Sequence, residues 1–305
     1  MSIIDTTLKL QSYLPVTGTF KIENVLPFVN DAQEKYMRKY LGAKLLGELD
    51  AFVESGTVPV WTGIAVNLVT SYLNKLLPYA QNAVTAFAFN LATPMLDVKI
   101  TDSGFAVISN NSTLVPASAE RVRKFRESIE ETGYSRVETM LQYLEENKAS
   151  YPTWAESDAC TLSSRNLVNS TEVFDAILDI NQSRLTFQKL RPELDNVEVL
   201  QIEPVISAEY AEILREEIRT DEVTADNLKV LVPLRKAVVY LTAGIAIDAK
   251  YTGRGTQFLA EVKKILDAAP ETYTVYAASD CYDATKTSYS AFENLEENQT
   301  FVFGG

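Results

Sequence analysis

The sequence contains two diverged copies of one pattern, and this internal repeat constrains the fold more than any local motif. The segment LPFVNDAQEKYMRKYLGAKLLGEL aligns with LRPELDNVEVLQIEPVISAEYAEIL when Pro27 is placed on Pro192, 165 residues later. Six apolar positions then coincide at helical spacing, which predicts the same amphipathic helix face in both copies. The coinciding residues are Val29, Ala32, Met37, Leu41, Leu45 and Leu49 in the first copy and Leu194, Val197, Ile202, Ile206, Tyr210 and Leu214 in the second.

The alignment continues beyond this helix. Gly42 falls on Ser207, and because both residue types are accepted helix caps, we expect each copy to break there and begin a second helix. QNAVTAF then aligns with RKAVVYL at an offset of 154 residues, so the second copy lacks 11 residues of a turn-rich loop near Gly56. DVKITDSG also resembles DAKYTGRG. The alanine-rich segments after Ala80 and Leu234 are the predicted central helix of each copy.

These patterns predict a mainly α protein of two tandem helical-bundle repeats. Residues 1–150 form the first repeat, with a short β-hairpin over 97–108 and a long helix over 118–147. Residues 151–170 are a linker, 171–269 form the second repeat, and 270–305 form an extended C-terminal arm. The long helix carries one apolar face that we expect to be buried: Val122, Phe125, Ile129, Val137, Leu141 and Leu144.

Composition excludes several classes of function. The chain has no histidine, which removes the usual general base, the usual metal ligand and every Ser-His or Cys-His nucleophile pair. Its two cysteines lack a CxxC partner, as expected of reduced thiols in the cytoplasm. A net charge of −13 argues against binding nucleic acid by phosphate neutralisation.

No secretory or membrane segment is predicted. The N-terminus MSIIDTTLKL lacks a basic stretch followed by an apolar block, so we expect a cytoplasmic protein. The longest apolar stretches fall short of the roughly 20 residues that a membrane span requires. They are predicted to be buried helices.

Two short motifs bear on catalysis. Asp102-Ser103-Gly104 matches the triplet of aspartic proteases, but a second triplet is missing and a hairpin turn accounts for the same residues. Gly253-Arg254-Gly255 lacks the third glycine of a phosphate-binding loop and favours a helix-terminal turn. We therefore predict no catalytic, cofactor-binding or metal site.

Two charged clusters are candidates for binding. Arg121, Arg123, Lys124 and Arg126 form the densest basic cluster, which fits either a contact with an acidic partner or a solvated helix face with local salt bridges. The helical phase assigns the neighbouring Phe125 to the core. Arg184, Arg191, Glu193 and Asp195 predict an ion-pair network, either within the fold or across an interface.

Several longer segments carry a resemblance over nearly the full length. VLPFVNDAQEKYMRKYLGAKLLGEL, VKITDSGF, LQYLEENK, INQSRLTFQKLRPEL and the terminal FVFGG resemble an uncharacterised family of about 300 residues encoded by Bacteroidetes bacteria, their phages and prophages. The resemblance implies a structural role in the virion. The helical bundle with a C-terminal arm is similar to head-tail connector (adaptor) proteins, which form rings under the portal.

The connector resemblance implies particular partners. They are further copies of the chain in a homo-oligomeric ring, the portal protein, and tail or collar proteins, with DNA passing the acidic surface without specific binding. Arm docking then falls to Phe292, Phe301, Val302 and Phe303, and an acidic partner meets the basic cluster at Arg121. The protein would reside in the virion and, during assembly, in the host cytoplasm.

Two alternatives stay open. Another collar or tail-completion protein would have the same composition. An enzyme that uses carboxylates alone, such as a magnesium-dependent phosphoryl-transfer enzyme, would need Asp and Glu to converge from separate helices.

Overall fold

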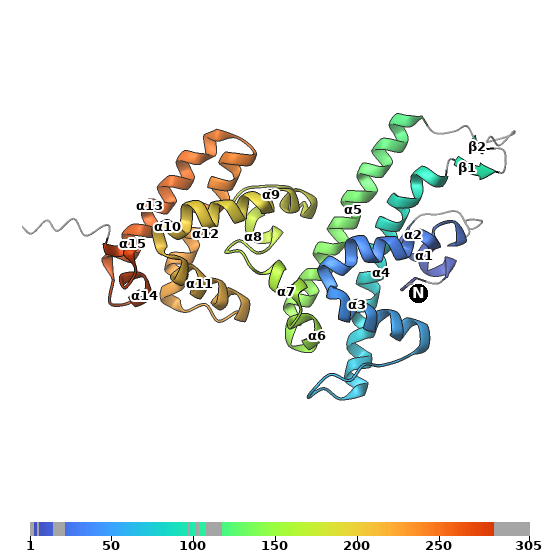
Figure 1. Cartoon of the computed structure of the whole chain (residues 1–305), viewed down its shortest axis with the longest axis horizontal. Helices are drawn as coiled ribbons and strands as arrows, with labels where there is room; N and C mark the ends of the chain where they lie inside the picture. Colours follow the sequence, from blue (N-terminus) through green and yellow to red (C-terminus); the bar gives the residue numbers. More distant parts are fainter. Residues whose placement is uncertain are drawn as a thin grey trace, which may run out of the picture. The chain divides into compact units, whose positions relative to one another are not determined.

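The computed structural model describes residues 3–4, 6–14, 22–96, 98–101, 104–107 and 118–283. Within these residues the chain is mainly α-helical, as predicted (Figure 1). The chain divides into two compact units, Met1–Asp195 (unit 1) and Asn196–Gly305 (unit 2). No helix among the described residues is both long and apolar enough to cross a membrane.

Unit 1 is a helical unit with one small hairpin. Its α-helices are α1 (Thr7–Tyr13), α2 (Leu26–Ala32), α3 (Arg38–Ser55), α4 (Val66–Leu96), α5 (Ala119–Glu146), α6 (Pro152–Ala155), α7 (Asp158–Ser163), α8 (Thr171–Asp175) and α9 (Arg184–Val197). Its other elements are the 3₁₀ turns η1 (Ile22–Asn24) and η3 (Lys148–Ser150), the π-helix η2 (Gln33–Met37), and the strands β1 (Val98–Thr101) and β2 (Gly104–Val107).

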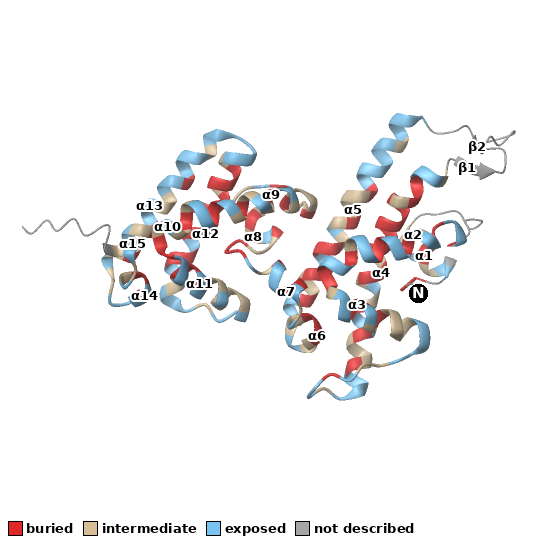
Figure 2. Cartoon of the chain, viewed as in Figure 1, coloured by how far each residue is buried: buried red, intermediate tan, exposed pale blue. Residues whose placement is uncertain are grey.

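The core of unit 1 is built around α4. Between Ala80 and Thr93 almost every residue of this helix is buried, and the many alanines allow neighbouring helices to approach closely (Figure 2). α5 and α2 pack on it. Pro78 lies inside α4 without ending it.

Strands β1 and β2 pair antiparallel beyond the end of α4. The register places Val98 opposite Val107 and Thr101 opposite Gly104. The turn residues Asp102 and Ser103 lie outside the described residues.

The segment that the sequence predicted to be a linker is helical at its start and packs within unit 1. Residues 152–163 form α6 and α7, and both helices pack on α3. Trp154 is 1% exposed, and its indole nitrogen Nε1 donates a hydrogen bond to the carbonyl oxygen of Tyr40 at 2.9 Å. The indole therefore fixes this segment to α3, because a buried donor needs its acceptor.

Unit 2 is helical in its described part. Its elements are the π-helix η4 (Glu198–Ile202), α10 (Glu203–Ile206), α11 (Ala208–Thr220), α12 (Ala225–Ala246), the 3₁₀ turn η5 (Ala249–Tyr251), α13 (Thr252–Ala268), α14 (Thr274–Ala277) and α15 (Asp280–Asp283). α12 is its central helix and packs along α13. The sequence placed this end of the chain in the extended arm, but α14 and α15 are helices, and Tyr276 is fully buried. The arm from residue 284 on lies outside the described residues.

The predicted helix face is buried at all of its positions. Each of the twelve aligned apolar residues in the two segments is at most 3% exposed. The prediction of these core residues from helical spacing is therefore confirmed.

Both segments also share two unusual backbone features. A π-helix occupies Gln33–Met37 and again Glu198–Ile202, 165 residues later. The predicted breaks are present as well: Gly42 has φ 77° and ψ 158°, and Ser207 has φ 72° and ψ 149°. Glycine adopts this region freely, whereas serine is strained there. Ser207 compensates by capping α11, because its hydroxyl accepts a hydrogen bond from the Tyr210 backbone N–H at 3.2 Å.

The first residue of each π-helix is buried and bonded to the same position of the following helix. In unit 1 the Gln33 amide nitrogen Nε2 donates to Asp50 Oδ1 at 2.9 Å. In unit 2 the pair is Arg215 and Glu198, joined at 3.0 Å. Both pairs obey the 165-residue offset, but the donor and acceptor have changed places.

A glycine lies at a close contact between two helices in each unit. A Cβ on Gly133 of α5 would lie 2.7 Å from the Phe87 ring of α4, and a Cβ on Gly255 of α13 would lie 2.6 Å from Leu241 of α12. Phe87 and Leu241 coincide at the 154-residue offset. The correspondence fails in between, because DVKITDSG spans β1 whereas DAKYTGRG forms η5 and the start of α13.

Candidate functional site

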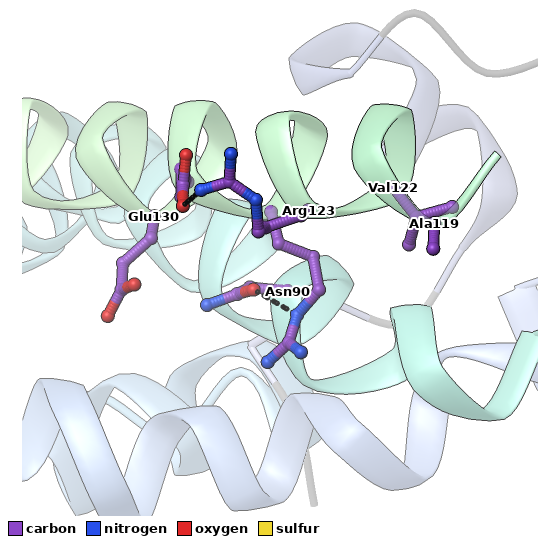
Figure 3. A pocket seen from close by; sticks show the side chains of 7 residues that line it. Asn90, Ala119, Val122, Arg123 and Glu130 are labelled. Atoms are coloured by element: carbon purple, nitrogen blue, oxygen red, sulfur yellow. Dashed lines mark hydrogen bonds and ion pairs between the residues drawn. The ribbon is translucent and has the colours of Figure 1, made fainter.

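The basic cluster lies on the first turns of α5, beside the C-terminal half of α4. Residues Ala119, Val122, Arg123, Arg126, Glu127 and Glu130 line a surface cleft of about 630 Å³ with Asn90 of α4 (Figure 3). On α5 these positions recur at intervals of three, four, seven, eight and eleven residues from Ala119, so they share one face of the helix. Ser118 begins this helix, because its hydroxyl accepts a hydrogen bond from the Arg121 backbone N–H at 3.4 Å.

Arg126 connects the two helices of the cleft. Its Nε donates a hydrogen bond to Asn90 Oδ1 at 3.3 Å (Figure 3). Asn90 is 6% exposed whereas Arg126 is exposed, so the amide is the fixed partner. The guanidinium keeps further donors for another group.

Arg123 and Lys124 are locally neutralised. Arg123 pairs with Glu120 at 2.8 Å and with Glu127 at 2.6 Å, and Lys124 lies 3.6 Å from Glu120. Hydrogen bonds to Glu120, followed by the charge of Glu127, raise the pKa of Arg123. Such exposed pairs are worth little to stability, because water and salt screen them.

Arg121 and Arg126 keep their charge available. Neither side chain forms an ion pair within the part of the chain that the structure describes. Each of the two functions considered for the cluster therefore fits a different pair of residues. Arg123 and Lys124 form local salt bridges, whereas Arg121 and Arg126 are available to an anionic group.

The prediction that Phe125 belongs to the core is wrong. Its side chain is 47% exposed, and Val122 is only half-buried, whereas Ile129, one turn later, is 5% exposed. The helical phase was correct, but among the described residues the apolar stripe is covered only from Ile129 onward. Met95, near the end of α4, is also 56% exposed.

The other predicted site residues are not brought to this cleft. Phe292, Phe301, Val302 and Phe303 lie outside the described residues. Gly253, Arg254 and Gly255 lie in the first turns of α13, where Gly255 packs against Leu241. No group of three or more Cys, Asp or Glu side chains that could hold a metal occurs among the residues described.

The sequence patterns did not predict one buried ion pair. Arg184 of α9 is 1% exposed and donates through NH1 to Glu138 Oε2 of α5 at 2.8 Å, while Thr171 donates to the same oxygen at 3.0 Å. The sequence grouped Arg184 with Arg191, Glu193 and Asp195 instead. A signal was present, because Glu138 interrupts the apolar stripe of α5 and a charge at such a position needs a partner.

Part of the chain matches a known protein family. Residues 43–164 match a family of unknown function (DUF6712). The matched region runs from α3 to the end of α7, so it contains α4, α5 and the cleft between them. The DUF6712 description assigns no activity. No curated protein and no solved structure matches the chain.

Proposed function

We propose that the chain is a structural protein of a phage virion, a head-tail connector or adaptor that forms a ring between portal and tail. The observation that carries the proposal is the exposed end of α5, where Phe125 is 47% exposed and the arginines at 121 and 126 are free of carboxylate partners among the described residues. Apolar side chains with arginines are what protein interfaces favour. The resemblance of the longer segments to a phage-encoded family points the same way.

The ring has a simple physical logic. In a head-to-tail interface, one patch on each copy meets a different patch on its neighbour. The repeat closes into a ring when the rotation from copy to copy divides a full turn evenly, without a shift along the axis. We propose that the Phe125 end of α5 is one such patch. The terminal residues Phe292, Phe301, Val302 and Phe303 add area by reaching an adjacent copy, the portal protein, or a tail or collar protein.

The net charge of −13 fits a passage for DNA that does not bind it. Like charges on the wall and on the phosphate backbone repel, so DNA moves past without being held. The protein would then be found in the virion, and in the host cytoplasm before assembly.

We further propose that the two helical segments arose by duplication of one unit. Four correspondences support this: the buried helix face, the π-helices, the breaks at Gly42 and Ser207, and the two glycine contacts. The matching polar contacts are a fifth correspondence: Gln33 bonds to Asp50, and Glu198 bonds to Arg215. Chance periodicity of apolar residues does not predict which polar side chains meet.

The role of Phe125 can be tested by substitution. Phe125→Ala should weaken association between copies about tenfold or more, because a buried aromatic side chain at an interface contributes at least about 1.4 kcal/mol. Leu68→Ala is the matched control, since Leu68 is 45% exposed on α4. Sedimentation velocity over a range of concentrations measures both. If both variants associate as strongly as the unchanged protein, Phe125 does not lie in the interface between copies.

Other roles predict different results. A collar or tail-completion protein would assemble with a tail component instead of the portal. A magnesium-dependent enzyme would show a higher melting temperature when Mg²⁺ is added, because a ligand that binds only the folded state stabilises it.

A further inference from the structure

A second cleft in unit 1 gathers positive charge on a strongly acidic chain. It has a volume of about 260 Å³ and lies between α3, the end of α7 and α9. Lys39 comes from α3, Arg165 follows α7, and Gln188, Arg191 and Asp195 come from α9. Their spacing along α9 is three and four residues, so one face of this helix forms a wall of the cleft.

The cations of the cleft outnumber its carboxylates three to one. Asp195 is the carboxylate, and it is bonded to the Arg165 guanidinium and to Asn166 Nδ2, the latter at 2.8 Å. Neither Lys39 nor Arg191 forms an ion pair with any residue that the structure describes. Lys39 Nζ donates instead to Gln188 Oε1 at 2.9 Å, and Arg191 NH2 donates to the carbonyl oxygen of Leu162.

The cations repel one another. Burial, followed by the charges of Arg184 and Arg165, lowers the pKa of Arg191 to about 10. Burial, followed by Arg191 and Arg184, also lowers the pKa of Lys39. Because its pKa stays at about 10, Arg191 is charged near neutral pH, and a bound anion would offset the repulsion between it and the neighbouring cations.

Buried donors without acceptors lie at the same place. Arg191 Nε and Gln188 Nε2 are shielded from solvent and have no hydrogen-bond partner, and the same holds for Nε of Arg184, which is 1% exposed on the same helix. Among the described residues this state is shared only by Thr242 Oγ1 and by Oδ1 of Asn166, whose Nδ2 is bonded to Asp195 of the cleft. Buried polar groups are normally satisfied, so unpaired donors beside a cationic cleft indicate a missing acceptor.

We propose that this cleft binds an oxyanion, a phosphate or a carboxylate, through Lys39, Arg191 and the amide of Gln188. An oxyanion supplies acceptors to the unpaired donors and negative charge to the unpaired cations, and charge-assisted hydrogen bonds to Arg and Lys are the strong ones. A volume of about 260 Å³ is below the range of drug-sized ligands, roughly 300 to 1,000 Å³. The cleft therefore takes one oxyanion group. The proposal does not depend on the virion role.

Titration of the full chain with inorganic phosphate tests the site. Calorimetry and thermal unfolding are carried out in phosphate, acetate and chloride at matched ionic strength. We expect saturable binding and a higher melting temperature in phosphate or acetate than in chloride. Tighter binding of phosphate assigns the site to a phosphate group, and tighter binding of acetate assigns it to the carboxylate of an acidic segment.

Variants identify the residues. Lys39→Gln and Arg191→Gln should each weaken the binding about tenfold or more, because each removes a charge-assisted hydrogen bond. Lys39 is exposed, so its variant is informative even if Arg191→Gln folds poorly. Arg123→Gln is the control, because it removes the same charge from α5. Stabilisation no greater than in chloride, binding that survives both substitutions, or an equal loss in Arg123→Gln would overturn the proposal.

Discussion

At the residue scale, two glycines allow neighbouring helices to pack closely. Gly133 faces Phe87, whose ring is stacked on Tyr36 with centroids 4.1 Å apart, so the ring has no room to retreat. Gly255 faces both the side chain and the backbone nitrogen of Leu241, at 2.6 and 2.8 Å from an added Cβ. Glycine is unfavourable inside a helix, so its presence at both contacts reflects packing rather than propensity.

Replacing either glycine with alanine should therefore destabilise the protein, although alanine has the higher helix propensity. Gly133→Ala and Gly255→Ala should each lower the free energy of unfolding by about 1–3 kcal/mol, the range for overpacked cores. Gly47→Ala and Gly253→Ala are matched controls in α3 and α13, with nothing within 4 Å of the added Cβ. They should be neutral or raise stability by up to about 1 kcal/mol. Urea denaturation measures all four, and a stabilised Gly133→Ala protein would show that the helices are further apart.

At the element scale, the π-helices are held by exchanged polar pairs. Glu198 is 2% exposed and Arg215 lies mostly buried beside it, which makes their ion pair costly to break from one side. In unit 1 the same geometry is achieved by an amide and a carboxylate. Burial raises the pKa of Asp50, and the hydrogen bond from Gln33 opposes that shift.

Transfer of the pair from unit 2 into unit 1 tests their equivalence. Asp50→Arg alone should destabilise the protein, because it buries a cation beside an amide. Gln33→Glu with Asp50→Arg should recover about 1–3 kcal/mol of that loss, the usual coupling energy of contacting residues. A double-mutant cycle by urea denaturation gives the coupling. A coupling energy near zero would mean that positions 33 and 50 are not equivalent to 198 and 215.

The sequence patterns predicted the helices more accurately than they predicted which side chains meet. Helical spacing located the buried face of both aligned segments because each apolar residue recurs where burial recurs, and Gly42 and Ser207 marked the breaks. The π-helices were not predicted, although the apolar residues step by five from Ala32 to Met37 and from Val197 to Ile202, where a regular helix steps by three or four. Phe125 was misplaced because spacing gives the face of a helix but not how far its neighbour extends. The Glu138 contact to Arg184 spans 46 residues, which no local pattern encodes.

In the candidate sites, too, local groups of residues were predicted but contacts between distant residues were not. The basic cluster on α5 was predicted as a group, but which arginines are neutralised depended on the positions of Glu120 and Glu127 along the helix. The oxyanion cleft was not predicted, because Lys39 and Arg191 lie 152 residues apart in the sequence. Only folding of α3 against α9 brings them together.

At the scale of the whole molecule, we propose a helical protein that acts as one part of a larger particle. The exposed end of α5 and the acidic balance of charge support this proposal. Residues 274–283 belong to unit 2, where Tyr273 and Tyr276 are buried, so an arm deletion that spares the fold begins after them. This boundary makes a clean test of the arm possible.

The most direct test is the solution mass by light scattering of the full chain and of a variant that lacks residues 284–305, each with and without a portal protein. The account predicts a closed ring, or a monomer that assembles only when portal protein is added and the arm is intact. A stable monomer that is indifferent to both the portal protein and the arm would contradict the connector role.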